Sequence, residues 1–185
     1  MLSKSPLRGD FFMLVSPHKS VPLLHTNRGG MKMMTFTQKE TLLLKDLISQ
    51  EELCVEKYTN HAEAACDPGL STMFKDIGMT EEQHLDTLTQ LSGGTVPAMG
   101  SGGKKPMVPQ QPFYTGQKQA EDKQVDKFLC ADILATEKHA SGLYDMSIFE
   151  FRDVGVRNVL NHIQKEEQEH GEKVYAYMEK NGMYS

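Results

Sequence analysis

The stretch Glu81-Glu82-Gln83-His84 has a counterpart 86 residues later, Glu167-Gln168-Glu169-His170. Both have the pattern Glu-x-x-His, and residues three apart in an α-helix project from the same face. A glutamate lies thirty residues before each copy, at Glu51 and at Glu137. Each half of the chain therefore supplies three potential metal-binding groups, and the six together suggest a two-metal site.

The offset of 86 residues also relates other positions of the two halves, without a gap. Identical residues meet at Asp46 and Asp132, Tyr58 and Tyr144, Asp67 and Asp153, Gly69 and Gly155, and Ile77 and Ile163. The chain thus repeats one helical hairpin, and its period is longer than that of solenoid units. We expect two copies packed face to face rather than a stacked array.

Length and charge limit the class of protein. The chain has 185 residues, a formal net charge of −5 and an isoelectric point near 5.8, which suits one domain and argues against a nucleic-acid partner. No run approaches the ~18 consecutive apolar residues of a membrane span. The three cysteines form no CxxC pair, so we interpret them as reduced thiols in or near the core of an intracellular protein.

The first residues differ from the rest of the chain. Prolines and glycines interrupt residues 1–34, and their only apolar run, residues 11–15, is too short for the core of a signal peptide. We therefore interpret residues 1–34 as a disordered or non-native extension. We expect no signal peptide, no transmembrane segment and synthesis in the cytoplasm.

Residues 35–184 are predicted to form an all-α, ferritin-like four-helix bundle. A capping box at Thr37 and an Asp67-Pro68 start signal delimit a hairpin over 37–91, and Asp153 caps the second helix of a hairpin over 118–181. The glycine- and proline-rich crossover, residues 92–117, is long enough to run the length of a helix. This predicts an up-down-down-up order. The alternative is a flexible tether between independent hairpins, neither of which has anywhere else to bury its apolar face.

The repeated groups are predicted to meet in the middle of this bundle. Four carboxylates and two imidazoles in an apolar core would cost several kcal/mol per unpaired ion, and bound metal removes that cost. Carboxylate oxygens with one imidazole per ion suit two iron or two manganese ions. The predicted metal ligands are Glu51, Glu81, His84, Glu137, Glu167 and His170.

Two tyrosines lie on the same helical stripes as the predicted ligands. Tyr58 and Tyr144 are each seven residues after a glutamate ligand, so they are either ordinary core residues, the interpretation the sequence favours, or hydrogen-bond partners of the ligands. Neighbouring glutamates are interpreted as solvated helix faces: Glu52, Glu82, Glu166, Glu169 and Glu172.

At these residues the chain resembles the ferritin-like superfamily, and most of all the coat F family of bacterial spore coat proteins. The resemblance is carried by residues 131–144 (ADILATEKHASGLY) and by residues 158–183, which end in YAYMEKNGM. The Glu-x-x-His repeat is also similar to rubrerythrins and manganese catalases. The resemblance implies bridging by Glu81 and Glu167, location in the spore coat, and association with other coat proteins or with itself.

Two functions remain open at this point. One is a di-metal oxidoreductase of peroxidase, catalase or ferroxidase type, which acts on a small oxidant such as peroxide or oxygen. The other is a purely structural spore coat component without turnover. A structural descendant is free to lose ligands, yet all six are present, which favours metal binding.

Overall fold

A computed structural model describes residues 34–98, 107–109, 114 and 117–184. These residues form four helices and no strand: α1 (Gln38–Ala64), α2 (Pro68–Ser92), α3 (Gln117–Ile148) and α4 (Val154–Lys180). The all-α prediction is confirmed. Almost all of the predicted N-terminal extension, residues 1–33, lies outside the described residues.

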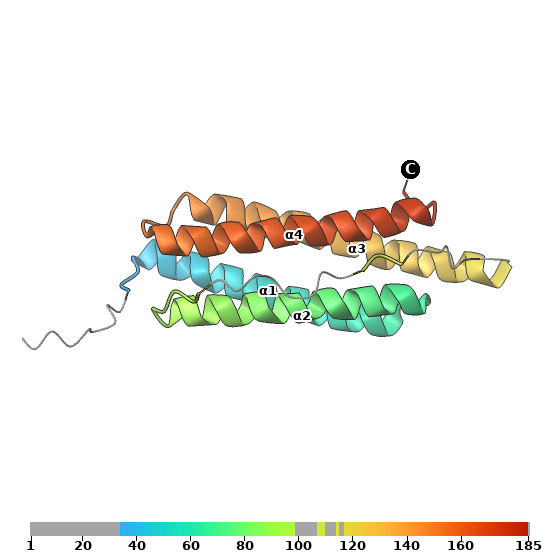
Figure 1. Cartoon of the computed structure of the whole chain (residues 1–185), viewed down its shortest axis with the longest axis horizontal. Coiled ribbons are helices and arrows are strands. Elements are labelled where there is room, and N and C mark those ends of the chain that lie inside the picture. Colours follow the sequence, from blue (N-terminus) through green and yellow to red (C-terminus); the bar gives the residue numbers. More distant parts are fainter. Residues whose placement is uncertain (1–33, 99–106, 110–113, 115–116, 185) are drawn as a thin grey trace, which may run out of the picture. The chain divides into compact units, whose positions relative to one another are not determined.

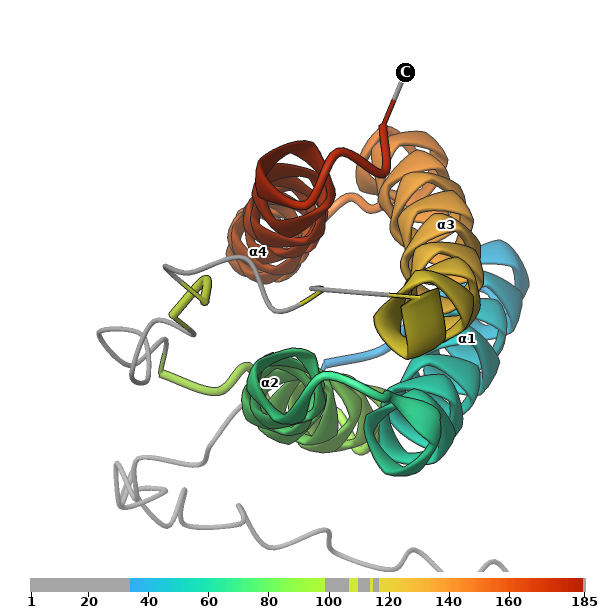
Figure 2. The same cartoon turned by 90° about the vertical axis from the view of Figure 1, so that its right-hand side faces the viewer.

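The helices form two antiparallel hairpins, α1 with α2 and α3 with α4, which pack against each other (Figure 1). In the end view α1 lies beside α3, and α2 lies on the same side as α4 (Figure 2). The helix directions are up, down, down and up, so the crossover between α2 and α3 has to return the chain along the bundle. The hairpins share one core, and the flexible-tether alternative is therefore wrong.

The crossover contacts both ends of the bundle. Near its start, Val96 lies against Gly155 at the beginning of α4, and near its end, Pro109 lies against Gly69 at the beginning of α2. The Tyr114 hydroxyl then contacts the Asp126 carboxylate at 2.5 Å and the Tyr177 hydroxyl at 2.8 Å. These contacts hold the described parts of the crossover against α2, α3 and α4.

Equivalent residues cap and anchor the two hairpins. Asp67 and Asp153 each accept a hydrogen bond at 2.7 Å from the backbone N–H two residues on, which caps α2 and α4. The turn between α1 and α2 donates two backbone N–H groups, each at 2.8 Å, to Asp126 of α3. The turn between α3 and α4 donates the Arg152 N–H, at 3.0 Å, to Glu40 of α1. Glu40 and Asp126 are 86 residues apart, so the repeat extends to these anchors.

The core consists of two apolar clusters with a polar layer between them. Towards the α1/α2 turn, Phe74, Ile133 and Tyr177 belong to one buried cluster, and towards the α3/α4 turn, Leu47 and Leu160 belong to the other. The apolar stripes predicted from helical spacing account for both. No helix among the described residues is long and apolar enough to cross a membrane.

Candidate metal centre

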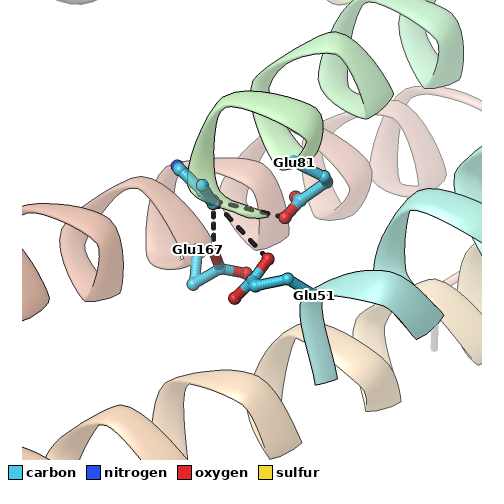
Figure 3. Close-up of side chains that lie close together, drawn as sticks. Glu51, Glu81 and Glu167 are labelled. Atoms are coloured by element: carbon cyan, nitrogen blue, oxygen red, sulfur yellow. Dashed lines mark hydrogen bonds and ion pairs between the residues drawn. The ribbon is translucent and has the colours of Figure 1, made fainter. Parts of the chain in front are cut away.

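The six predicted ligands form the polar layer between the two apolar clusters. Each residue is at most 3% exposed, and the six come from all four helices: Glu51, Glu81, His84, Glu137, Glu167 and His170. Figure 3 shows the carboxylates of Glu51, Glu81 and Glu167 turned towards one another from α1, α2 and α4. The antiparallel hairpins bring residues thirty apart to the same height, which is why the repeated spacing produces one cluster.

The cluster consists of two overlapping groups of ligand atoms. In the first, one atom from each of Glu51, Glu81, His84 and Glu167 lies within 4.8 Å of the others. Glu137 and His170 form the second group with the same Glu81 and Glu167, within the same limit. Glu81 and Glu167 thus belong to both groups, and each group has one glutamate and one histidine of its own. The ferritin-like resemblance implies this arrangement for two bridged ions.

Both histidines turn Nδ1 into the cluster. His84 Nδ1 lies 2.9 Å from a Glu167 oxygen and 3.3 Å from a Glu81 oxygen, and His170 Nδ1 lies 2.7 Å from the other Glu81 oxygen. The two rings stack with centroids 5.8 Å apart. Each imidazole therefore offers one nitrogen to the shared carboxylates and turns its other edge away from them.

Several buried ligand atoms make no hydrogen bond. Among the described residues these include Glu51 Oε2, Glu137 Oε2 and one carboxylate oxygen of Glu167, whereas Glu81 Oε1, the other Glu167 oxygen and His170 Nδ1 have only the close histidine–carboxylate contacts given above. A buried polar atom without a partner costs about 1–3 kcal/mol. These atoms are hard oxygen donors and imidazole nitrogens gathered in one small volume, so the residues fit hard di- or trivalent cations such as iron or manganese.

Without a bound cation, burial and mutual repulsion disfavour the ionised form of carboxyl groups in the cluster. Burial, and then the charge of Glu167, raise the pKa of Glu51 and of Glu137 well above the usual range. Burial also opposes ionisation of Glu81, but the close contacts with His170 and His84 outweigh it and hold that pKa well below the usual range. The cluster thus combines two carboxyl groups that resist ionisation with one that is ionised. This is expected where several carboxyl groups lie close together away from water, because burial and like charges both disfavour the ionised form.

The two tyrosines link the hairpins at this layer. Tyr144 donates a hydrogen bond to Glu51 Oε1 at 2.5 Å, and Tyr58 donates one to Glu137 Oε1. Both tyrosines are completely buried, so each is a core residue and also a ligand partner. Each hydroxyl reaches the glutamate of the opposite hairpin rather than the glutamate on its own helix.

One sequence interpretation is wrong. Glu166, expected on a solvated face, lies with its Oε2 2.9 Å from His84 Nε2, and its side chain is 22% exposed. Burial disfavours the charged form of His84, yet its contacts with the acceptor oxygens of Glu166 and then Glu167 raise its pKa well above the usual value. The repeat carries no signal for this contact, because the residue 86 positions before Glu166 is Thr80.

Most of the other sequence predictions around the cluster agree with the structure. Glu52, Glu82 and Glu172 are exposed, as expected for solvated faces, whereas Glu169, for which the same was expected, is only partly exposed. All three cysteines are free thiols, with Cys54 and Cys130 buried and Cys66 partly so. Phe128, an apolar residue of α3, is 70% exposed because it lies outside the stripe that faces the core.

Part of the chain is similar to a known protein family. The family model described as Coat F domain matches residues 125–185, which include most of α3 and all of α4. No curated protein and no solved structure matches the chain. The similarity to ferritin-like proteins, rubrerythrins and manganese catalases stays a prediction, whereas the α3/α4 part of the chain is similar to a coat F domain.

Proposed function

We propose that this protein is a spore coat protein whose helical bundle holds two iron or manganese ions and reacts with peroxide or oxygen. The match to a Coat F domain supports the spore coat part of the proposal. Its partners would then be other coat proteins or further copies of the same chain. The chemical part rests on the cluster of buried, unpartnered ligand atoms between α1, α2, α3 and α4.

The donor set supports one terminal pair for each ion. Glu51 with His84 would hold one ion, Glu137 with His170 the other, and Glu81 and Glu167 would bind both. Bound ions of this kind supply Lewis acidity and a change of oxidation state.

The remaining residues keep the ligands in position. Tyr58 and Tyr144 donate to one oxygen of each terminal carboxylate, which leaves the second oxygen for an ion. Glu166 accepts at His84 Nε2, so that Nδ1 is presented to the cluster. The apolar clusters above and below the layer exclude water from it.

A purely structural coat protein is the second candidate, because the Coat F match supports it equally. In that case any bound ions would stabilise the core without turnover. The two candidates differ in turnover, and a metal-binding measurement paired with an activity measurement separates them.

The test is elemental analysis of the full chain purified without a metal-affinity step, with assays of ferrous ion oxidation and peroxide consumption. We expect about two iron or manganese ions per chain, as the two overlapping ligand groups imply. The double variant Glu81→Ala with Glu167→Ala should hold none. The matched control, Glu82→Ala with Glu169→Ala on the same two helices, should hold as much metal as the wild type.

Each outcome decides between the candidates. Two ions with turnover support the oxidoreductase, and two ions without turnover support the structural coat protein. Unchanged metal content in the Glu81 and Glu167 double variant would exclude the proposed ligands.

A further inference from the structure

The six ligands of the candidate metal centre are buried, so a cation needs a route from the surface to reach them. Apolar clusters close the layer above and below. Moving an unpaired cation through an apolar core is too costly for either cluster to serve as that route. An entry route therefore has to follow polar side chains that lead outwards from a ligand.

A cavity between α3 and α4 does not provide such a route. It measures about 480 Å³, and its lining includes Glu137, Glu167 and Gly171. The oxygens of Glu137 and Glu167 that lack hydrogen bonds are nevertheless sealed from solvent. The cavity therefore ends short of the ligand atoms.

Hydrogen bonds lead from the ligands to three other side chains among the described residues, Tyr58, Tyr144 and Glu166. The two tyrosines are completely buried, whereas 22% of the Glu166 side chain is exposed. Glu166 belongs to α4, and its partner His84 belongs to α2. The polar contacts of the ligands therefore reach the surface where α2 and α4 face each other.

Glu166 continues outwards to a second histidine. His162 lies one turn earlier on α4, and its Nε2 is 3.4 Å from Glu166 Oε2, the same oxygen that lies 2.9 Å from His84 Nε2. The exposed fraction of the side chain falls from 35% at His162 to 22% at Glu166 and 4% at His84. On the inner side, His84 Nδ1 lies 2.9 Å from Glu167. Nitrogen and oxygen donors thus form a continuous line from water to a shared carboxylate.

The charge and the donor types of this line suit a divalent cation. Four carboxyl groups lie at its inner end, and negative charge at the end of a narrow passage concentrates cations there. His162 and Glu166 are four residues apart, so one helix face presents both donors to a single ion. The repeat provides no second copy, because the equivalent residues on α2 are Asp76 and Thr80.

We propose that His162 and Glu166 form an entry site at which a divalent cation binds before it reaches the metal centre. The inference rests on the proposed function, because it describes how the same centre is filled. The ion binds between His162 Nε2 and the Glu166 carboxylate, where the two side chains now contact each other. His84 lies between Glu166 and Glu167, so its ring has to turn before the inner carboxylates become accessible.

The first test measures how fast the metal-free full chain takes up Co²⁺, whose visible absorption changes when carboxylate and imidazole replace water. His162→Ala should slow uptake about tenfold, within the range by which charged entrances accelerate association. It should leave the number and affinity of bound ions unchanged, because His162 contacts Glu166 rather than a ligand. The control His139→Ala removes an exposed histidine of α3 and should change neither rate nor affinity.

Release has to follow the same route in reverse. If the affinity is unchanged, the rate of release falls by the same factor as the rate of uptake. Transfer of Co²⁺ from the loaded chain to excess chelator should therefore also be slower in His162→Ala. The measurement uses chelator concentrations at which the rate no longer depends on the chelator.

The second test asks whether His162 and Glu166 act on one ion. Glu166→Gln keeps an oxygen that accepts from His84 Nε2 but removes the charge, so it should slow uptake at least as much as His162→Ala. The double variant should be no slower than Glu166→Gln alone, because the effects of residues that share a partner are not additive. Asp76→Ala with Thr80→Ala, at the equivalent positions of α2, is the control and should take up Co²⁺ at the wild-type rate.

The outcomes separate the entry site from the centre itself. Unchanged uptake in His162→Ala, additive effects of the two substitutions, or slower uptake with an equal loss of affinity would overturn the entry site and leave the metal centre standing. A wild-type chain that binds no cobalt, ferrous or manganous ion would overturn the proposed centre and the entry site together.

Discussion

The α1/α2 and α3/α4 hairpins contribute the same three ligand types to the polar layer but surround them differently. His84 has a carboxylate partner, Glu166, on the opposing hairpin, whereas the equivalent position for His170 is occupied by Thr80. Gly171 leaves a cavity beside the ligands of α3 and α4, and its equivalent is Leu85.

The difference separates two kinds of constraint. The proposed ligands come from all four helices, and shared ions would require both hairpins to keep them, so the proposal puts this layer under a common constraint. Residues beside the layer contact the ligands of one hairpin only, as Glu166 does for His84, and the repeat does not require their equivalents to match.

The largest expected effect comes from breaking one of the two equivalent turn anchors. Asp126 is completely buried and accepts two backbone N–H groups of the α1/α2 turn as well as the Tyr114 hydroxyl. Asp126→Ala strands these donors, and since each costs about 1–3 kcal/mol, we expect a loss of about 3–5 kcal/mol in the free energy of unfolding. Urea titration of the metal-free chain measures it.

The comparison within that experiment is Glu40→Ala, which removes the equivalent anchor. Its partner Arg152 is mostly exposed, and water replaces part of what is lost, so we expect about 1–2 kcal/mol. Glu121→Ala on the exposed face of α3 is the control and should stay within about 0.5 kcal/mol of the wild type. Equal losses for the two anchors would mean that the hairpin ends are energetically equivalent.

The second effect concerns Glu166, the carboxylate partner that His84 has and that His170 lacks at the equivalent position. Glu166→Ala removes the acceptor at His84 Nε2, and loss of such a partner typically weakens metal binding about 10- to 100-fold. Competition with a chelator should show one ion weakened and the other nearly unchanged. Thr80→Ala, at the equivalent position on α2, should leave both affinities unchanged. Equal weakening of both ions would show that Glu166 acts on the whole layer.

The six-residue cluster was predictable from the sequence because it depends on spacing alone. Equal distances from Glu51 and Glu81 to the turn before Asp67 set their common height, and the repeat transfers the arrangement to Glu137 and Glu167. The helix starts at Thr37, Asp67 and Asp153 were predictable for a similar reason, because caps are local.

Contacts between helices that the repeat does not relate were not predictable. The contact of Glu166 with His84 depends on how α4 is rotated against α2, and Glu166 in sequence resembles any surface glutamate beside a ligand. The cavity at Gly171 arises from a missing side chain, whose consequence appears only when the packing of α3 and α4 is known. Tyr114 likewise contacts Asp126 from outside the four helices.

A smaller effect tests whether the two hairpins also differ at the hydrogen bonds to Glu51 and Glu137. Tyr58→Phe and Tyr144→Phe each remove the donor to one terminal carboxylate, and a lost buried hydrogen bond costs about 1–2 kcal/mol. Because the two hydroxyls occupy equivalent positions, thermal unfolding of the metal-free variants should show equal losses, about 2–4 °C per kcal/mol for a chain of this size. Unequal losses of stability would show that the two tyrosine–glutamate hydrogen bonds are not energetically equivalent.

The smallest effect is a pH dependence at the α3/α4 turn. Burial opposes ionisation of Glu40, but hydrogen bonds from Arg152 and from the Thr37 backbone outweigh it and lower its pKa from 4.5 to about 2. A carboxyl whose pKa falls on folding stabilises the folded state fully above pH 4.5, and this contribution disappears as the pH falls towards 2. Since Arg152 is exposed and salt screens it, we expect about 1 kcal/mol.

Glu40→Gln isolates that contribution from the other carboxyl groups. Wild type and variant should differ by the full amount at pH 6, and the difference in unfolding free energy should shrink as the pH is lowered through 4.5 towards 2. Urea titrations at matched ionic strength measure it, with Glu121→Gln as the exposed control. A difference that stays constant down to pH 2 would mean that the Glu40 side chain anchors Arg152 and the turn through shape and neutral hydrogen bonds rather than through its charge.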